Sequence, residues 1–206
     1  MTENQPSRAK ADLRRELLAA RRALSADTLR TAAGALARTA LRLPELSSAH
    51  TVAAYVSIGS EPGTRELLDA LRAAGARVLL PVLLPDNDLD WAAYEGPESL
   101  AEAAHLGKMR LLEPAGPRLG PDAVTGADAV LLPGLAVDRR GMRLGRGGGS
   151  YDRVLERLER AGADPALVVL LYDDEVVARV PEEPHDHPVR AVATPSGVLR
   201  FSSDAL

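Results

Sequence analysis

The chain begins with a pattern of apolar and basic residues that predicts an amphipathic helix over residues 10–24. At about 100° per residue, its apolar stripe consists of Leu13, Leu17, Ala20 and Leu24. The neighbouring stripe is basic and consists of Lys10, Arg14 and Arg21. We expect this basic stripe to lie at the edge of the domain, within reach of a bound phosphate, whereas Arg15 and Arg22 point to solvent. The alternative is that all five basic side chains lay their stems along the surface.

The next part of the chain alternates between helical and strand-like patterns. Ser25 is a typical N-cap for a second helix that reaches about Leu43 and stops at Pro44. A buried strand, a helix and another strand are expected at residues 51–58, 66–74 and 76–84. This strand-helix-strand order predicts a parallel pair of strands joined by a right-handed crossover.

The second half of the chain extends this alternation. We expect an antiparallel strand, a short helix and a surface loop at residues 88–94, 97–104 and 107–120. These are followed by a strand, a helix and two further strands at residues 128–132, 151–161, 166–172 and 191–194. The sum is a single α/β domain over residues 1–206, with a mostly parallel sheet flanked by helices in a Rossmann-like three-layer arrangement. In such a sheet, the segments that follow the carboxyl ends of the strands meet at one rim, where ligands bind. In this chain the segments expected to meet there are residues 57–61, 133–152 and 172 onward.

Composition narrows the class of protein. The 206 residues are 46% hydrophobic and 26% charged, as in globular proteins, and the formal net charge of −4 argues weakly against a nucleic-acid binder. The absence of cysteine excludes disulfides and thiolate chemistry. No apolar run could cross a membrane, and the polar residues 1–9, expected to be disordered, do not form a secretory signal. We therefore expect a cytoplasmic monomer with no membrane or nucleic-acid partner.

A glycine-rich stretch carries the strongest chemical signal. Residues 131–152, LLPGLAVDRRGMRLGRGGGSYD, join an apolar run to a glycine loop and then to a helix-like sequence. Backbone N–H groups of such a loop, together with a helix N-terminus, can bind an anion. Arg143 and Arg146 add guanidinium groups suited to phosphate, and Asp152 offers an oxygen ligand for magnesium. The pattern indicates a nucleotide-triphosphate site; the alternative is a flexible, solvated glycine loop.

The loop fits neither of two common nucleotide motifs. A Walker loop requires a lysine that is missing here. The dinucleotide fingerprint requires a third glycine, where this chain has Ser150.

Residues 133–153, PGLAVDRRGMRLGRGGGSYDR, resemble the signature of the 5-formyltetrahydrofolate cyclo-ligase family. The resemblance extends to Lys10-x-x-x-Arg14, to Tyr55-Val-Ser57 followed by Glu61-x-x-Thr64, and to Val180-Pro-x-x-x-His-Asp186. It therefore covers nearly the whole chain in the same order. The reaction that it implies is the closure of 5-formyltetrahydrofolate to 5,10-methenyltetrahydrofolate, with ATP as co-substrate, Mg²⁺ as cofactor, and ADP and phosphate as products.

The resemblance also implies roles for individual residues. Those expected to contact ATP are Lys10, Arg14, Arg143, Leu144, Gly145, Arg146, Gly147, Gly148, Gly149, Ser150 and Tyr151. Those expected to contact the folate are Val56, Glu61, Arg146, Gly147, Gly148, Gly149 and Ser150. Asp152 and Asp186 are the expected magnesium ligands, and Arg146, Tyr151 and Asp152 are the expected catalytic residues.

Several of these residues have a simpler interpretation. Glu61 is also typical of a surface charge near a helix start, Asp152 of a first-turn helix acid, and Asp186 of a turn. Two departures from the family pattern, Ser150 in place of a tyrosine and Arg190 in place of an aspartate, put the acceptor in question. An ATP-using paralogue with another acceptor, a nucleotide- or RNA-binding module and a sugar-phosphate isomerase remain as alternatives. Trp91 is expected in the core, and the histidines show no helical metal-ligand spacing.

Overall fold

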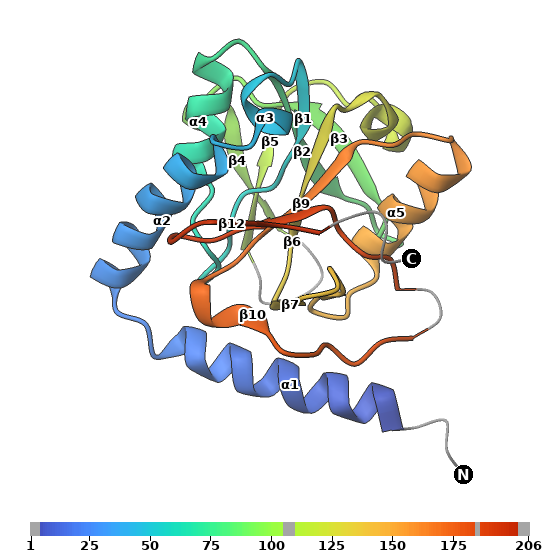
Figure 1. Ribbon diagram of the computed structural model, residues 1–206. Helices are drawn as coiled ribbons and strands as arrows, with labels where there is room; N and C mark the ends of the chain where they lie inside the picture. The colour runs from blue at the N-terminus through green and yellow to red at the C-terminus, as the bar shows by residue number, and fades with distance from the viewer. Residues whose placement is uncertain (1–4, 105–109, 184–185, 202–206) are drawn as a thin grey trace.

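The structure is a computed structural model that describes residues 5–104, 110–183 and 186–201 (Figure 1). At its centre is a seven-stranded sheet with the order β12-β11-β9-β6-β1-β2-β3. In that order the strands are Val198–Arg200, Ala191–Ala193, Ala166–Leu170, Ala129–Pro133, Thr51–Ala53, Arg77–Leu83 and Leu89–Ala93. The five inner strands are parallel, and β12 and β3 are antiparallel to their neighbours. The predicted mostly parallel α/β sheet is confirmed.

The strand order reverses direction at β1. From β1 the chain first crosses to β2 on one side and then to β6 on the other, so that β1 and β6 are neighbours although they are far apart in sequence. The loops that leave the carboxyl ends of β1 and β6 therefore diverge, which opens a crevice between them. The fold places a ligand site at this position.

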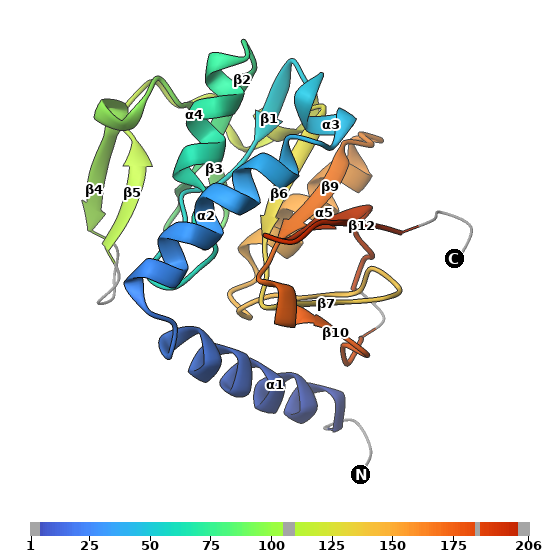
Figure 2. The same ribbon diagram turned by 60° about the vertical axis from the view of Figure 1, so that its left-hand side comes forward.

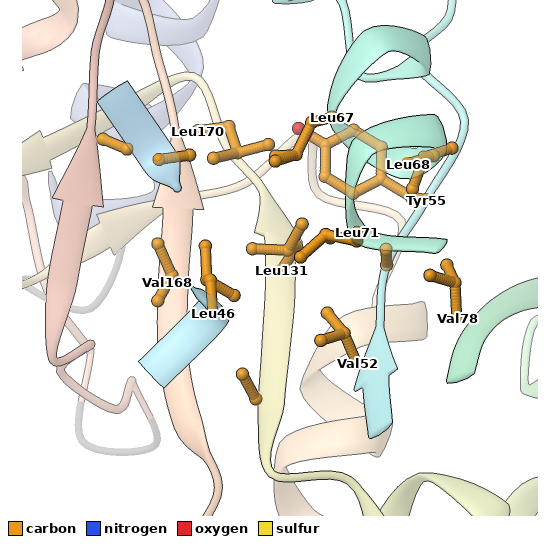
Figure 3. Packing of buried hydrophobic residues seen from close by; sticks show 14 of the residues in the cluster. Leu46, Val52, Tyr55, Leu67, Leu68, Leu71, Val78, Leu131, Val168 and Leu170 are labelled. Atoms are coloured by element: carbon orange, nitrogen blue, oxygen red, sulfur yellow. The ribbon is translucent and has the colours of Figure 1, made fainter. Parts of the chain in front are cut away.

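Helices cover both faces of the sheet. Helices α2 (Ala26–Ala40), α3 (Pro44–Ser47) and α4 (Arg65–Ala73) lie on one face, and α5 (Ser150–Arg160) lies on the other (Figures 1 and 2). Side chains alternate across each strand, so Leu131 packs with α3 and α4 while Val130 packs with α5 (Figure 3). The expected N-cap is confirmed, since the Ser25 hydroxyl accepts the Thr28 N–H. Trp91 is fully buried, as predicted.

The first helix, α1 (Gln5–Arg22), lies outside these layers and packs on a small sheet. This sheet contains β10 (Val176–Val177), β7 (Ala136–Asp138) and β8 (Arg143–Leu144). Leu17 of α1 belongs to the same apolar cluster as Leu144 and Val180. The predicted helix is confirmed, but it begins at residue 5 rather than 10, so the expected disorder of residues 5–9 is wrong; residues 1–4 lie outside the described part of the chain.

Two expectations for the middle of the chain are also wrong. Residues 97–104, predicted as a helix, form a 3₁₀ turn, η1 (Pro97–Ser99), followed by strand β4 (Leu100–Ala104). Strand β5 (Arg110–Pro114), in the predicted loop, pairs antiparallel with β4. Figure 2 shows this hairpin as a separate pair of strands at one side of the molecule, and its strand β5 contacts β2 of the main sheet. Two further 3₁₀ turns, η2 (Pro121–Gly126) and η3 (Asp173–Glu175), complete the elements. Within the described residues, no helix is long and apolar enough to cross a membrane.

Candidate functional site

A cavity of about 320 Å³ lies at the carboxyl ends of β1 and β6. Its polar side comes from the glycine loop, which contributes Arg143, Gly145, Arg146, Gly147, Gly148, Gly149, Ser150, Tyr151 and Asp152. The remaining wall is mostly apolar and contains Tyr55, Val56, Ile58, Glu61, Pro81, Leu83, Leu89, Leu111, Leu112, Glu113 and Pro133. The expectation that segments after β1 and β6 meet at one rim is confirmed. Tyr172, from the third such segment, lies close by, because its hydroxyl donates to the Ser60 carbonyl over 3.2 Å.

The glycine loop leads directly into the N-terminus of α5. Gly147 and Gly149 have positive φ angles of 88° and 78°, which residues with a side chain rarely adopt. No side chain caps the first turn of α5, so its N–H groups are available to an anion. Arg14 lies beside Gly147, with its guanidinium carbon 3.4 Å from the position of a Cβ there. The loop therefore combines backbone donors, a helix dipole and a nearby cation.

Arg143 is a buried cation beside this loop. Its Nη1 donates to the Pro133 carbonyl over 3.1 Å, and its Nη2 contacts the Asp152 carboxylate at 3.2 Å. Its Nε is buried without a hydrogen-bond partner among the described residues. Burial lowers the pKa of this guanidinium below its usual value, although Asp152 opposes that shift. A buried donor of this kind needs an acceptor, which a phosphate oxygen could supply.

Glu61 and Arg146 form an ion pair in the wall of the cavity. Arg146 Nε lies 3.1 Å from Glu61 Oε1, while Glu61 Oε2 accepts the Ile58 N–H over 2.8 Å. Only 8% of the Glu61 side chain is exposed, so the alternative of a surface charge near a helix start is wrong. A buried carboxylate beside an apolar wall can accept hydrogen bonds from N–H groups of a ligand.

Tyr151 and Tyr55 place two phenols at the same cavity. Tyr55 is buried and Tyr151 is half-buried with an enclosed hydroxyl, and burial raises the pKa of each phenol above its usual value, so both are neutral donors at physiological pH. The Tyr151 hydroxyl lacks a hydrogen-bond partner within the described structure. It is therefore a second buried polar group, after Arg143 Nε, that a ligand could satisfy.

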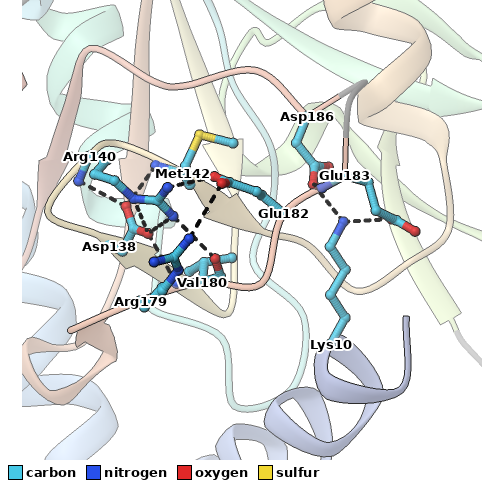
Figure 4. Close-up of polar contacts among 9 residues, drawn as sticks. All are labelled: Lys10, Asp138, Arg140, Met142, Arg179, Val180, Glu182, Glu183 and Asp186. Atoms are coloured by element: carbon cyan, nitrogen blue, oxygen red, sulfur yellow. Dashed lines mark hydrogen bonds and ion pairs between the residues drawn. The ribbon is translucent and has the colours of Figure 1, made fainter. Parts of the chain in front are cut away.

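Helix α1 brings Arg14 to the glycine loop and Lys10 to the neighbouring segment that carries Glu183 and Asp186. Arg14 Nε donates to the Gly145 carbonyl over 2.8 Å. Lys10 Nζ lies 2.6 Å from Asp186 and 2.7 Å from Glu183 (Figure 4). Burial alone would lower the pKa of Lys10, but the hydrogen bonds to these two carboxylates outweigh it and raise that pKa. Lys10, which belongs to the expected basic stripe, therefore points inward. Arg15 and Arg22 are exposed, as predicted.

Arg21 has a different role from the one expected. It is 2% exposed and binds Glu175 through two hydrogen bonds of 2.6 and 2.8 Å, and it also donates to the Gly134 carbonyl. The guanidinium stacks near the Tyr172 ring, 5.7 Å from its centroid. The prediction that Arg21 lies at the edge within reach of a phosphate is wrong, because this ion pair anchors α1 to the body of the protein.

Asp138 connects two segments beside the glycine loop through hydrogen bonds. It is fully buried and accepts N–H groups from Arg140, Met142 and Val180 at 2.8, 3.2 and 3.0 Å (Figure 4). Burial opposes its ionisation, but these hydrogen bonds and the Arg140 side chain lower the pKa of the carboxyl below its usual value. The Asp138 carboxylate thereby connects the turn between β7 and β8 to the segment that carries Glu183 and Asp186.

A second, polar cavity of about 230 Å³ adjoins the first. Its lining consists of Arg143, Asp152, Leu155, Glu156, Glu159, Asp186 and His187. Both aspartates predicted as magnesium ligands border this space, and Arg143 and Asp152 also border the first cavity. The described residues contain no preformed cluster of three or more metal-ligating side chains. Two carboxylates beside a loop that could bind phosphate suit Mg²⁺, which usually completes its shell with phosphate oxygens and water.

Some predicted residues lie away from the cavity. Leu144 is buried in the apolar contact with α1, and its carbonyl accepts the Leu135 N–H over 2.7 Å, so it can shape the loop but cannot present a side chain to a ligand. Arg190 pairs with Asp164, just before β9, at the opposite end of the sheet from the glycine loop. Arg190 therefore does not oppose a metal at Asp152 and Asp186. His105 and His185 lie outside the described residues.

Sequence reasoning missed the apolar wall of the cavity. Pro81, Leu83 and Leu89 come from β2 and β3, and Leu111 and Glu113 come from β5. A proline inside a strand pattern was the available signal, because proline marks a position where no ladder hydrogen bond is needed. The contribution of β5 had no such signal, since that strand was not predicted.

The sequence and the fold both match known proteins. A profile of the 5-formyltetrahydrofolate cyclo-ligase family matches residues 6–195. The chain is 46% identical over 153 residues to a 5-formyltetrahydrofolate cyclo-ligase of Mycolicibacterium smegmatis, which covers 72% of this chain and 75% of that protein. It is 33% identical over 183 residues to the Escherichia coli K12 protein of the same name, covering 88% and 97% of the two chains.

The fold resembles the solution structure of 5,10-methenyltetrahydrofolate synthetase from Aquifex aeolicus. The TM-score is 0.76 and the sequence identity 28%, and the match covers 94% of this chain and 93% of that one. The matches in sequence and in fold extend over most of the chain, including the glycine loop and the segments that converge on it. This protein belongs to the 5-formyltetrahydrofolate cyclo-ligase family.

Proposed function

We propose that the protein closes 5-formyltetrahydrofolate to 5,10-methenyltetrahydrofolate at the expense of ATP. The observation that carries the proposal is the cavity itself, in which an apolar wall and a buried carboxylate face a phosphate-binding loop. A flat folate ring and a nucleotide phosphate can meet in such a space. Family membership supports the same reaction.

The chemistry requires activation of a poor leaving group. The formyl oxygen attacks the γ-phosphorus, an O–P bond forms, and the bond to ADP breaks. N10 of the folate then attacks the activated formyl carbon and loses its proton, and the C–O bond breaks to release phosphate. The protein contributes mainly orientation and charge neutralisation, as is typical of phosphoryl transfer.

The phosphate site is the loop from Arg143 to Tyr151. The N–H groups of Gly147, Gly148, Gly149 and Ser150 and the start of α5 face the phosphates, and Arg143 Nε gains the acceptor that it lacks. Lys10 and Arg14 complete the site from α1, whereas Leu144 contributes through its backbone alone. Arg146 neutralises charge on the transferred phosphoryl group, and the Tyr151 hydroxyl donates a hydrogen bond to the reacting atoms.

The folate site is the apolar side of the cavity. Val56 and the leucines contact the ring faces, Glu61 accepts hydrogen bonds from the ring N–H groups, and residues from Arg146 to Ser150 lie beside the formyl group. When folate N–H groups engage Glu61, Arg146 is released from its ion pair and can turn to the phosphate. Folate binding thereby favours the arrangement that phosphoryl transfer needs.

Asp152 and Asp186 would hold the Mg²⁺ ion. The ion supplies neutralisation of the β- and γ-phosphate charges when it is bound. Asp152 contacts Arg143 and Asp186 contacts Lys10, so each aspartate already has a positive partner. Arg143 and Lys10 would be free to contact the phosphates if these carboxylates held Mg²⁺.

Coupled release of ADP tests the proposal. Purified protein with ATP and Mg²⁺ should release ADP only when 5-formyltetrahydrofolate is added, with one ADP for each folate consumed. ADP release at the same rate without folate, or with folate left unchanged, would reject the assignment. ADP release with a different amide or carboxylate acceptor, and none with this folate, would favour a paralogue.

A further inference from the structure

Strand β2 is longer than its neighbour β1 at the cavity end. The Arg77 N–H donates to the His50 carbonyl on the β1 side over 2.7 Å. N–H groups alternate in direction along a strand, so those of residues 79, 81 and 83 also point to this side. Strand β1 ends at Ala53, which is paired with Leu79. Positions 81 and 83 therefore face the space beyond β1, which is the cavity.

An unpaired backbone N–H is avoided in a different way at position 81 and at position 83. Position 81 is proline, which has no N–H, so no donor is left unpaired. The Leu83 N–H donates to Glu113 Oε1 over 2.9 Å. Glu113 is 7% exposed and lines the cavity together with Pro81 and Leu83. A buried carboxylate from another element thus satisfies the last N–H that β2 directs into the cavity.

Glu113 belongs to the β4–β5 hairpin, which forms a sheet of its own. The hairpin therefore has no strand-to-strand ladder with the main sheet to fix its distance from β2. Leu111 lies two residues before Glu113, on the same face of β5, and also lines the cavity. Leu100 and Leu112 of the hairpin pack against the core, and the hydrogen bond from Leu83 to Glu113 adds a direct link to β2 beside Leu111, which lines the same cavity as Leu83 and Leu89.

We propose that Glu113 is a positioning residue for the folate: it fastens the β4–β5 hairpin to the end of β2 and so sets the width of the apolar slot. The ligand named here rests on the proposed function. A flat ring system gains dispersion energy on both faces only when the two walls are one ring thickness apart, so a looser hairpin weakens folate binding. The phosphate loop is formed by other elements, so ATP binding does not depend on this contact.

Three variants test the proposal. Glu113→Ala removes the acceptor, Glu113→Gln keeps a carbonyl oxygen at the same reach, and Glu95→Ala removes an exposed carboxylate between β3 and the hairpin as a control. Glu113→Ala should weaken 5-formyltetrahydrofolate binding about tenfold and leave the affinity for an ATP analogue within about twofold. Glu113→Gln and Glu95→Ala should resemble the wild type. Should Glu113→Ala fail to fold, Glu113→Asp, which retracts the carboxylate by one methylene, makes the same comparison.

Amide hydrogen exchange at Leu83 gives a readout that needs no ligand. Exchange should be faster in Glu113→Ala and unchanged in Glu113→Gln. An unchanged folate affinity in Glu113→Ala, or an equal loss of folate and ATP affinity, would overturn the positioning role, as would slow Leu83 exchange in that variant. If wild-type protein binds no 5-formyltetrahydrofolate while Leu83 exchange depends on Glu113 as expected, the proposed substrate fails and the hairpin contact stands.

Discussion

At the scale of single residues, the cations proposed to bind phosphate already have partners. Lys10 is paired with Asp186 and Glu183, Arg143 with Asp152, and Arg146 with Glu61. These carboxylates include the proposed ligands for magnesium and folate. Under the proposed function, binding of one ligand would therefore release a cation that another ligand needs, and this would couple the sites without a large movement of the backbone.

This coupling predicts an unusual effect of Glu61→Gln. In the absence of folate, the variant should bind a non-hydrolysable ATP analogue about two- to fivefold more tightly, because Arg146 no longer forms its partly exposed ion pair. The same variant should bind 5-formyltetrahydrofolate more weakly. Isothermal titration with each ligand measures both effects. Unchanged or weaker binding of the analogue would show that the ion pair does not restrain Arg146.

Arg14 and Arg15 form a natural pair for comparison. Arg14 contacts the glycine loop, whereas Arg15 is exposed and pairs only with Asp12 among the contacts described for it. Arg14→Ala should raise the KM for ATP by about tenfold or more, while Arg15→Ala should change it by less than about twofold. Steady-state kinetics at saturating folate provides the measurement. Equal effects would contradict the orientation of α1.

At the scale of elements, the buried ion pair between Arg21 and Glu175 is one of the contacts that attach α1. Removing one partner of a buried pair leaves an uncompensated charge, so Arg21→Met should lower the free energy of unfolding by about 3 kcal/mol. Adding Glu175→Gln should restore part of that loss. Urea unfolding of the two variants tests this, and a loss below about 1 kcal/mol for Arg21→Met would mean that the pair does not anchor the helix.

The turn between β7 and β8 depends on the charge of Asp138. Because its folded pKa is lower than its unfolded pKa, ionised Asp138 stabilises the fold above the unfolded value, and this contribution is lost as the pH falls through the folded value. Asp138→Asn should therefore be less stable than the wild type by about 2 kcal/mol at neutral pH. The difference should shrink below about pH 4. A difference that stays constant from pH 7 to pH 3 would exclude this charge contribution.

At the scale of the whole molecule, the elements predicted correctly are those whose pattern of apolar residues extends over many positions. The long helices were recognisable because their apolar period extends over several turns, and the inner strands because they lie within continuous apolar runs. Strands of two residues, such as β8 and β10, offer no pattern to recognise. Residues 100–104 are good helix formers, but pairing with β5 decides their conformation.

The features of the site also divide into those that the sequence could predict and those that it could not. The glycine loop is contiguous in the sequence, so its residues could be predicted to act together. The contacts between Lys10 and Asp186, Arg21 and Glu175, and Leu83 and Glu113 join residues far apart in the chain. No local pattern specifies such partners, and only the folded chain shows which carboxylate each cation meets.

The most direct test of the proposed reaction is absorbance of wild-type protein incubated with 5-formyltetrahydrofolate, ATP and Mg²⁺. We expect a rise of the near-ultraviolet band of the methenyl product that requires both ATP and Mg²⁺. Asp152→Asn, a change at an exposed side chain, should lower the rate by about 100-fold while the protein remains folded. A protein that binds ATP and folate but produces no methenyl band would contradict the proposed reaction.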